Sequence, residues 1–359
     1  MRSLQALLAL FACAFLPLHA AGLDDLTWTT TDGEVTITNC DEAASGELVI
    51  PDTIGGNPVT SIGNNAFQHC SSLTSITIPE GVTSIGIATF ANCSSLTSIT
   101  IPDGVTSIGE QAFRDCSSLT SITIGDSVTS IGVQAFFRCG SLTIITIPDS
   151  VTSIGDFAFY DCRRLTSITI PDSVTSIGGN AFRDCNSLMS ISIPDSVTSI
   201  EDDAFRDCNS LTSVTIGQSV TSIGDSAFED SRSLTNITFL GAAPAVGVSA
   251  FFGVSEEAQA FVSNEFADSF GGFGSTWAGL TVASQRPFAI TACGFANTST
   301  FFIEFEPAGT GYRVMSSSTL DFGNAVEVTP TLQPTSAGDN RFEFTTSGSR
   351  NFYRLEPVQ

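Results

Sequence analysis

One fixed spacing constrains this chain more than any other feature. Seven cysteines recur every 23 residues, and a period of this size is typical of a solenoid in which each repeat forms one coil. They are Cys70, Cys93, Cys116, Cys139, Cys162, Cys185 and Cys208. Because a stack adds core with every coil, the 359 residues do not require several compact domains. Such a stack presents an extended surface.

Each repeat contains a short strand followed by turns. Leu96, Ile99 and Ile101 are spaced so that their side chains face one side of a strand. Pro102 ends that strand, because proline lacks the N–H that a sheet requires. The Ala-Phe pair at 112 and 113 suits a single helical or 3₁₀ turn on the opposite side of the coil. One coil cannot be stable alone, so the array needs neighbours and caps.

The repeat resembles a known family. Its pattern reads Cys-Ser-Ser-Leu-Thr-Ser-Ile-Thr-Ile-Pro-Asp-Ser-Val-Thr-Ser-Ile-Gly-x-x-Ala-Phe over residues 48 to about 252, and it resembles the BspA-type leucine-rich repeat. The resemblance implies a leucine-rich repeat solenoid with a curved parallel β-sheet on one face and short turns, 3₁₀ or helical, on the other. It also implies a secreted or surface protein, in a family where adhesion is proposed for some members. Ser231, which replaces the next cysteine, is expected to mark the start of a cap.

The regions on either side of the repeats differ in composition. An apolar run from Leu4 to Leu18 with small residues after it predicts a signal peptide. Alternating segments such as 301–305 and 341–345 predict antiparallel strands, and they resemble small β-sandwich modules that close exported proteins of environmental bacteria. We therefore expect a signal peptide at 1–20, an N-terminal cap at 21–60, the solenoid at 61–240, a C-terminal cap at 241–284 and a β-sandwich module at 285–359.

The charge balance restricts the partners. Thirteen Lys and Arg face 37 Asp and Glu, which gives a net charge of −24. A polyanion repels nucleic-acid phosphates and anionic lipid headgroups, so we expect no nucleic-acid partner. No segment after the signal peptide approaches the roughly 18 apolar residues of a membrane-spanning helix. We expect an exported monomer whose partner is an extracellular protein or glycan.

The cysteines are expected to remain reduced. Successive coils stack about 4.8 Å apart, whereas a disulfide requires Cβ atoms at about 3.5–4.5 Å in a specific twist. A ladder of buried thiols, each donating weakly to the backbone, is therefore favoured over disulfides. Cys40 and Cys293 lie outside the ladder, and the sequence leaves their oxidation state open.

Little in the sequence indicates catalysis, a cofactor or a metal. His69 is the one histidine after the signal peptide, so no second histidine completes a zinc site with it. Two acidic rows could bind Ca²⁺, but solvated corners partly neutralised by Arg114, Arg183 and Arg206 are the favoured interpretation. The first row is Asp103, Asp126, Asp149, Asp172 and Asp195, and the second is Asp115, Asp161, Asp184, Asp207 and Asp230.

The outward residues of the strands form the candidate binding face. With Leu and Ile facing inward, the Thr and Ser between them face outward in every coil. Thr is also a good strand former, so the regularity has a structural explanation as well as a functional one. The candidates are Thr97, Ser98, Thr100, Thr120, Ser121, Thr123, Thr166, Ser167, Thr169, Thr212, Ser213 and Thr215. Ile144, Met189 and Asn236 interrupt the rows.

Three functions remain open. The first is a non-enzymatic binding or adhesion scaffold that makes many weak contacts with a protein or glycan. The second is a carbohydrate-active enzyme that uses paired carboxylates. The third is a Ser/Thr surface that binds ice or a crystalline polysaccharide, which requires a flat sheet.

Overall fold

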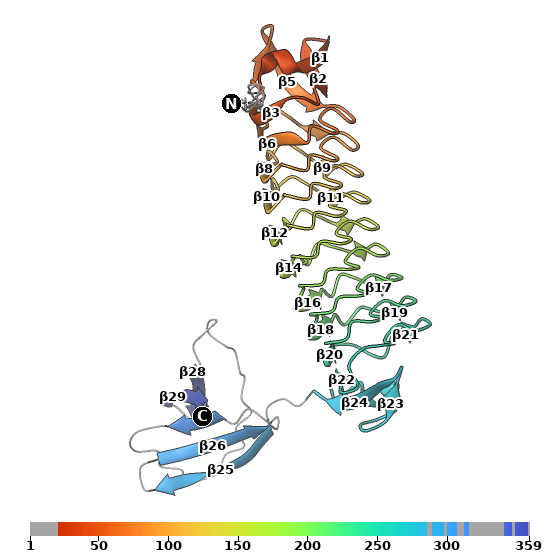
Figure 1. Ribbon diagram of the computed structural model, residues 1–359. Coiled ribbons are helices and arrows are strands. Elements are labelled where there is room, and N and C mark those ends of the chain that lie inside the picture. Colours follow the sequence, from red (N-terminus) through yellow and green to blue (C-terminus); the bar gives the residue numbers. More distant parts are fainter. Residues whose placement is uncertain are drawn as a thin grey trace, which may run out of the picture. The chain divides into compact units, whose positions relative to one another are not determined.

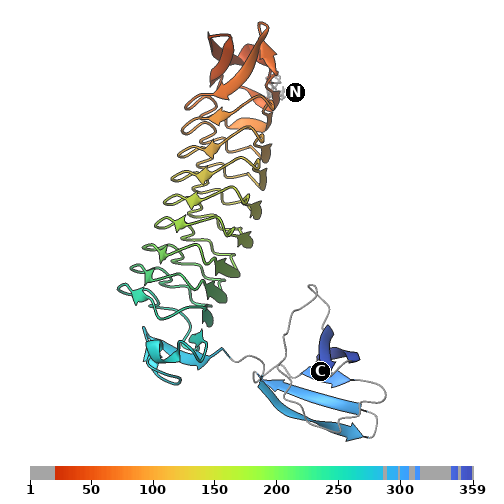
Figure 2. The same cartoon turned by 180° about the vertical axis from the view of Figure 1, so that it is seen from behind.

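The computed structural model describes residues 21–285 in full and the backbone of five further strands. The predicted signal peptide, residues 1–20, lies outside the described residues. The chain divides into two units, Met1–Ser284 and Gln285–Gln359. In the first unit the repeats form an elongated stack of coils, which Figure 1 and Figure 2 show from opposite sides.

A parallel sheet, here called the main sheet, runs along one side of the stack (Figure 1). Its strands form where inward Leu and Ile alternate with outward Ser and Thr. They are β3 (Ser45–Val49), β6 (Ser72–Thr77), β8 (Ser98–Thr100), β10 (Ser121–Thr123), β12 (Ile144–Thr146), β14 (Ser167–Thr169), β16 (Ser190–Ile193), β18 (Ser213–Ile216), β20 (Asn236–Phe239), β22 (Gln259–Val262) and β24 (Leu280–Ser284). The ladder is interrupted between β10 and β12 and between β14 and β16, and β23 (Thr276–Trp277) pairs antiparallel with β24.

A second parallel sheet, which the sequence analysis did not predict, follows the Ser-Ile dipeptides of the repeat. Most of its strands are two residues long, too short to give a periodic signal. They are β5 (Asn57–Ile62), β7 (Ser84–Ile85), β9 (Ser107–Ile108), β11 (Ser130–Ile131), β13 (Ser153–Ile154), β15 (Ser176–Ile177), β17 (Ser199–Ile200), β19 (Ser222–Ile223) and β21 (Ala245–Val246). The ladder of this sheet is interrupted between β7 and β9. At the N-terminal end β2 (Glu34–Cys40) pairs parallel with β5, while β1 (Leu26–Thr31) and β4 (Thr53–Ile54) pair antiparallel with β2 and β5.

The third side of the coil, here called the turn side, consists of turns. Residues 112–113 lie at the centre of a single turn, closed by the N–H of Arg114 on the carbonyl of Gln111 at 3.0 Å, and this turn does not extend into a helix. The N–H groups of Ala112 and Cys116 each close one turn, on the carbonyls of Gly109 and Phe113. Gln111 and Asp115, however, have φ angles of 57° and 55°, and these left-handed residues prevent the turns from continuing as a helix. Among the described residues the 3₁₀ helices are η1 (Leu23–Asp25) and η2 (Ala267–Phe270).

A column of phenylalanine rings fills the core beside the turn side. Adjacent rings stack with centroids 5.2–5.4 Å apart and planes within 14° of parallel. The rings are Phe67, Phe90, Phe113, Phe136, Phe159, Phe182, Phe205, Phe228 and Phe251. Each coil therefore covers the apolar face of the one before it, which is how a repeat that is unstable alone becomes stable in the stack.

The second unit contains two sets of antiparallel strands. β25 (Ala289–Asn297) pairs with β26 (Thr300–Glu306), and β29 (Ser349–Pro357) pairs with both β27 (Tyr312–Met315) and β28 (Arg341–Thr346). The segments between most of these strands lie outside the described residues. The β-sandwich expected at 285–359 therefore stays a prediction.

Candidate binding face

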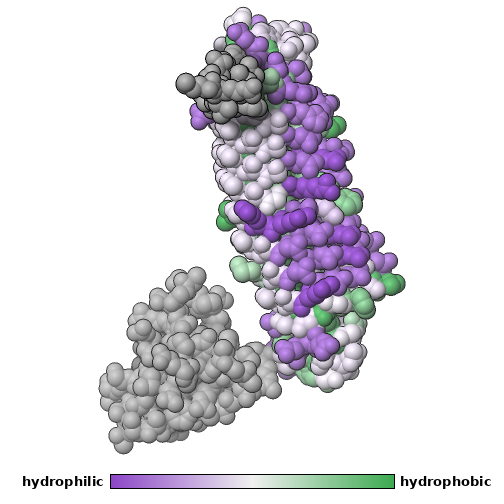
Figure 3. Space-filling model, viewed as in Figure 1, coloured by the Kyte–Doolittle hydropathy of each residue, from purple (hydrophilic) through white to green (hydrophobic). Residues whose placement is uncertain are grey.

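The twelve predicted residues lie on or directly before strands of the main sheet, with ten exposed and two half-buried. The half-buried ones are Ser213 and Thr215. Parallel pairing sets like residues side by side, as in Ser98 with Ser121 and Thr100 with Thr123. Figure 3 shows a nearly neutral strip on the side where Figure 1 places the main sheet, beside a strongly hydrophilic band. The rows thus lie along one face of the stack.

One column of hydroxyl groups on this face is already hydrogen-bonded to the backbone. In six coils the first Thr of the strand segment donates its Oγ1–H to the carbonyl one coil earlier, at 3.0–3.3 Å. These are Thr97, Thr120, Thr143, Thr166, Thr212 and Thr235. Such a hydroxyl retains its acceptor lone pairs but has no second proton to donate. The Ser and Thr that follow in each strand are the freer donors.

The same bond recurs on the second sheet, where the sequence analysis named no residues. Here too a Thr hydroxyl donates to the carbonyl of the preceding coil, at 3.0–3.4 Å. These residues are Thr83, Thr129, Thr152, Thr175 and Thr221. The signal was present in the sequence as the constant Val-Thr-Ser-Ile of each repeat. The hydrogen bond itself could not be predicted, because it depends on how the coils stack, which the spacing of the residues does not specify.

Two apolar side chains protrude from the main sheet. Ile144 is 57% exposed and takes the place of the Ser that its neighbour Ser167 provides one coil later. Met189 is 56% exposed and stands where the other coils have the Thr whose hydroxyl donates to the preceding coil. Both stand in the coils at which the ladder of the main sheet is interrupted. The face is therefore polar with two apolar interruptions, and Asn236 is an exposed polar one.

The two acidic rows have local explanations. The first row is exposed, and in it Asp103 and Asp195 accept the backbone N–H of the residue one coil later, Asp126 and Gln218. The second row has φ angles of 55–62°, a conformation in which Asp and Asn are enriched. His69 occupies the same position in its coil with φ 67° and is exposed. Backbone geometry thus accounts for the repeated Asp.

The second row is paired with arginines, as the sequence predicted. Arg114, Arg183 and Arg206 lie 3.1, 3.7 and 3.5 Å from the Asp that follows each of them. Burial, and then the charge of Asp207, raise the pKa of Asp184, against the opposing influences of a hydrogen bond with Tyr160 and of the charge of Arg183. In the part of the chain that the structure describes, no three His, Cys, Asp or Glu side chains are grouped to hold a metal ion.

The cysteine ladder is reduced, and its predicted bonds to the backbone are confirmed. Each thiol from Cys93 to Cys208 donates to the carbonyl of a Phe 26 residues earlier, with S···O distances of 3.0–3.2 Å. Burial raises the pKa of these thiols, for Cys116 to about 12. Cys40 is also free and buried, and its largest pKa-raising influence is a hydrogen bond with Cys70. The Cys293 side chain lies outside the described residues.

Ser231 does not mark the end of the ladder, contrary to expectation. It is fully buried and donates its hydroxyl to the Phe205 carbonyl at 2.8 Å, so it repeats the bond of the cysteines. Serine can replace cysteine at this position because its hydroxyl, like the thiol, is a small hydrogen-bond donor. The regular packing continues one coil further, to the ring of Phe251.

These features define a leucine-rich repeat solenoid, and the comparison with known families is more specific. A family model described as BspA type leucine rich repeat region matches residues 47–163 and 129–257. The matches span more than half of the chain, and the chain belongs to this family. No curated protein matches it.

Several solved structures resemble the chain. The leucine-rich repeat protein of T. pallidum is 28% identical over 60% of this chain and 91% of its own, with a TM-score of 0.44. A leucine-rich cell surface protein from Faecalibacterium prausnitzii is also 28% identical, covering 73% and 93%, with a TM-score of 0.42. The pneumococcal vaccine antigen PcpA is 14% identical over 75% and 99%, with a TM-score of 0.38.

Proposed function

We propose that this protein is an exported, non-enzymatic scaffold that binds an extracellular protein or glycan through the outer face of its main sheet. Membership in the BspA-type family supports a repeat scaffold. The expected signal peptide at 1–20 supports export. None of the helices in the described residues is long and apolar enough to cross a membrane.

The observation that carries the proposal is the registered row of exposed hydroxyl groups on a stacked sheet. Thr100 and Thr123 lie side by side, as do Thr146 and Thr169. Each contact to such a group is weak, but a ligand that spans several coils engages many of them at once. The stack holds the groups at fixed spacing, so little ordering free energy is lost on binding.

The carboxylates favour a scaffold over the carbohydrate-active enzyme. Members of the first row accept backbone N–H groups, and members of the second pair with Arg. The protruding Ile144 and Met189 break the regularity that a crystalline ligand requires. A protein surface or a single glycan chain therefore fits this face better than ice or a crystalline polysaccharide.

An array of glycans and extracellular matrix proteins, probed with the full chain, tests the proposal. We expect one class of ligand to bind, and the double variant Thr123→Arg with Thr169→Arg to bind it at least about tenfold more weakly. The matched control is Ser107→Arg with Ser176→Arg, which places equal bulk and charge at exposed positions of the second sheet. The proposal is contradicted if the two double variants weaken binding equally, or if neither of them weakens it.

A further inference from the structure

The two ends of the stack are covered differently. At the N-terminal end β2 extends the second sheet beyond β5, and Ala66 and Phe67 of the first coil are fully buried. At the C-terminal end β22 and β24 extend the main sheet, but the second sheet ends at its edge strand β21. The turn side ends at residues 249–253. Beyond the last coil, therefore, only the main sheet gains further paired strands in the described part of the first unit.

The uncovered part of the last coil presents a row of backbone donors. One coil earlier, three alternate N–H groups donate to three alternate carbonyls of the last coil, at 2.8–2.9 Å. These pairs are Ser226 with Val248, Phe228 with Ala250 and Asp230 with Phe252. In the last coil the equivalent N–H groups, those of Ser249, Phe251 and Gly253, have no acceptor among the described residues. Although residues 249–253 form turns and not a strand, such a row of unpaired N–H groups can donate to the carbonyls of another chain, as the edge strand of a sheet does.

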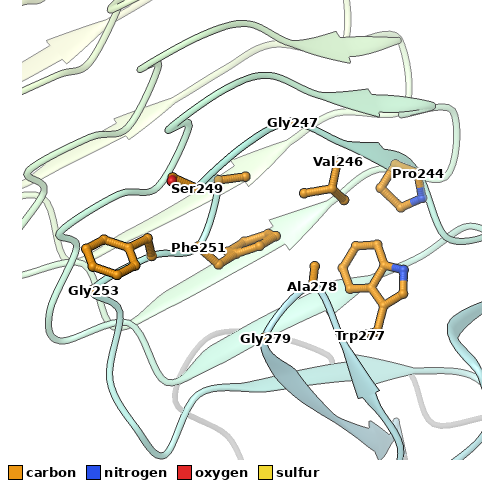
Figure 4. A pocket seen from close by; sticks show the side chains of 11 residues that line it. Pro244, Val246, Gly247, Ser249, Phe251, Gly253, Trp277, Ala278 and Gly279 are labelled. Atoms are coloured by element: carbon orange, nitrogen blue, oxygen red, sulfur yellow. The ribbon is translucent and has the colours of Figure 1, made fainter.

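The same three residues line a cavity of about 650 Å³ (Figure 4). Its other walls are mostly apolar, from Val246, Phe252, Trp277 and Ala278. Phe251, the last ring of the stacked column, is 6% exposed, and Phe252 is 66% exposed. Trp277 lies against Phe251 at a tilt of 52°, with centroids 6.3 Å apart, so it does not continue the stack.

We propose that this open end binds a peptide segment of a partner protein, which adds to the stack as one further coil. Three alternate carbonyls of the peptide accept the N–H groups of Ser249, Phe251 and Gly253, and an aromatic side chain enters the cavity against Phe251. Main-chain bonds of this type provide affinity, and the cavity provides specificity. The net charge of −24 favours a neutral or cationic peptide.

A second copy of the chain is a poorer occupant. To stack head to tail, it would have to present the carbonyl edge of its own first coil. Ala66, whose carbonyl is the middle one of that edge, is fully buried. A free peptide segment has no such obstruction. This site is separate from the outer face of the main sheet, so the two proposals fail independently.

A probe can be taken from the chain itself. The peptide Ser-Ile-Gly-Val-Gln-Ala-Phe-Phe-Arg, residues 130–138, has no acidic side chain and one Arg. In the stack the carbonyls of Val133, Ala135 and Phe137 accept N–H groups of the preceding coil at 2.8–2.9 Å. Its Phe136 ring stacks on the ring of Phe113 at 5.4 Å. The peptide therefore carries the complement of the open end.

Hydrogen exchange of the full chain, with and without this peptide, tests the site. We expect saturable slowing of exchange at Ser249, Phe251 and Gly253. Ala278→Leu, which places bulk in the cavity, should weaken binding about tenfold or more, as should replacing Phe136 of the peptide by Ala. Ala242→Leu, an exposed alanine outside the cavity lining, should leave binding unchanged.

Each alternative has its own outcome. No slowing at the three amides overturns the proposal, as does equal binding by Ala278→Leu. Concentration-dependent self-association that Ala278→Leu abolishes, without peptide binding, would assign the end to a second copy. Protection by a free oligosaccharide and not by the peptide would assign it to a glycan. Both results contradict a peptide site.

Discussion

At the scale of single residues, backbone conformation explains what composition alone made ambiguous. In the sequence, the second acidic row left calcium binding open, although corners partly neutralised by arginine were favoured. Its members are left-handed, and the chain places Asn92, Arg138 and His69 at the same position. None of these three residues supplies a carboxylate, but each adopts the left-handed backbone conformation of the position. The row is therefore a consequence of turn geometry, with arginines supplying the opposite charge.

Asp184→Asn should stabilise the protein in a pH-dependent way. The pKa of Asp184 is raised in the folded protein, which means that folding favours the protonated carboxyl group. The resulting stabilisation is complete below the ordinary pKa of 3.8 and is lost as the pH rises and the group ionises. Asn tolerates the left-handed backbone and carries no charge. We expect the melting temperature to rise by about 1–2 °C at pH 7 and to be unchanged at pH 3. A lower melting temperature at pH 7 would contradict this, and the exposed Asp172→Asn is the control.

The ladder thiols should resist alkylation in the folded protein. Cys93, Cys116 and Cys139 are fully buried, so the reagent cannot reach them. Their pKa values are raised, so the reactive thiolate form is scarce at neutral pH. Iodoacetamide at pH 7.5 followed by peptide mass spectrometry should find these cysteines unmodified in buffer and modified in guanidinium chloride. Modification in buffer would show that the coils open readily.

At the scale of elements, the sequence predicted whatever depends on alternation within one coil. Leu96, Ile99 and Ile101 face inward, and the main sheet follows from them. The second sheet was missed because strands such as Ser107–Ile108 are too short for a pattern. The single turn at residues 112–113 was predicted, but nothing in the sequence shows that Gln111 is left-handed, which keeps this turn from continuing as a helix. The open C-terminal end depends on how the cap packs, which no repeat pattern encodes.

Replacing a phenylalanine by alanine should destabilise the protein most in the middle of the phenylalanine column. Phe159→Ala removes a fully buried ring stacked on both sides, and we expect a loss of about 3–5 kcal/mol in the free energy of unfolding. Phe251→Ala should cost less, because this ring is slightly exposed and stacked on one side only. Urea denaturation measures both. Equal losses would mean that the column does not act as the continuous core described above.

At the scale of the whole molecule, the stack is a single continuous core in the first unit, and its stability is shared among neighbouring coils. Calcium should contribute little, because the second acidic row is paired with arginine. We expect millimolar Ca²⁺ to change the melting temperature by less than about 1 °C relative to Mg²⁺. A rise of many degrees with Ca²⁺ alone would show that the acidic rows bind it.

Multivalency is the central claim, and it predicts how affinity depends on the number of intact coils. The most direct measurement is the affinity of the ligand found on the array for variants with Thr100→Arg, Thr123→Arg and Thr169→Arg, made singly and in combination. We expect each substitution to weaken binding by a similar factor and the effects to accumulate. Loss concentrated in one substitution, or no loss in the triple variant, would contradict a ligand held across many coils of the main sheet.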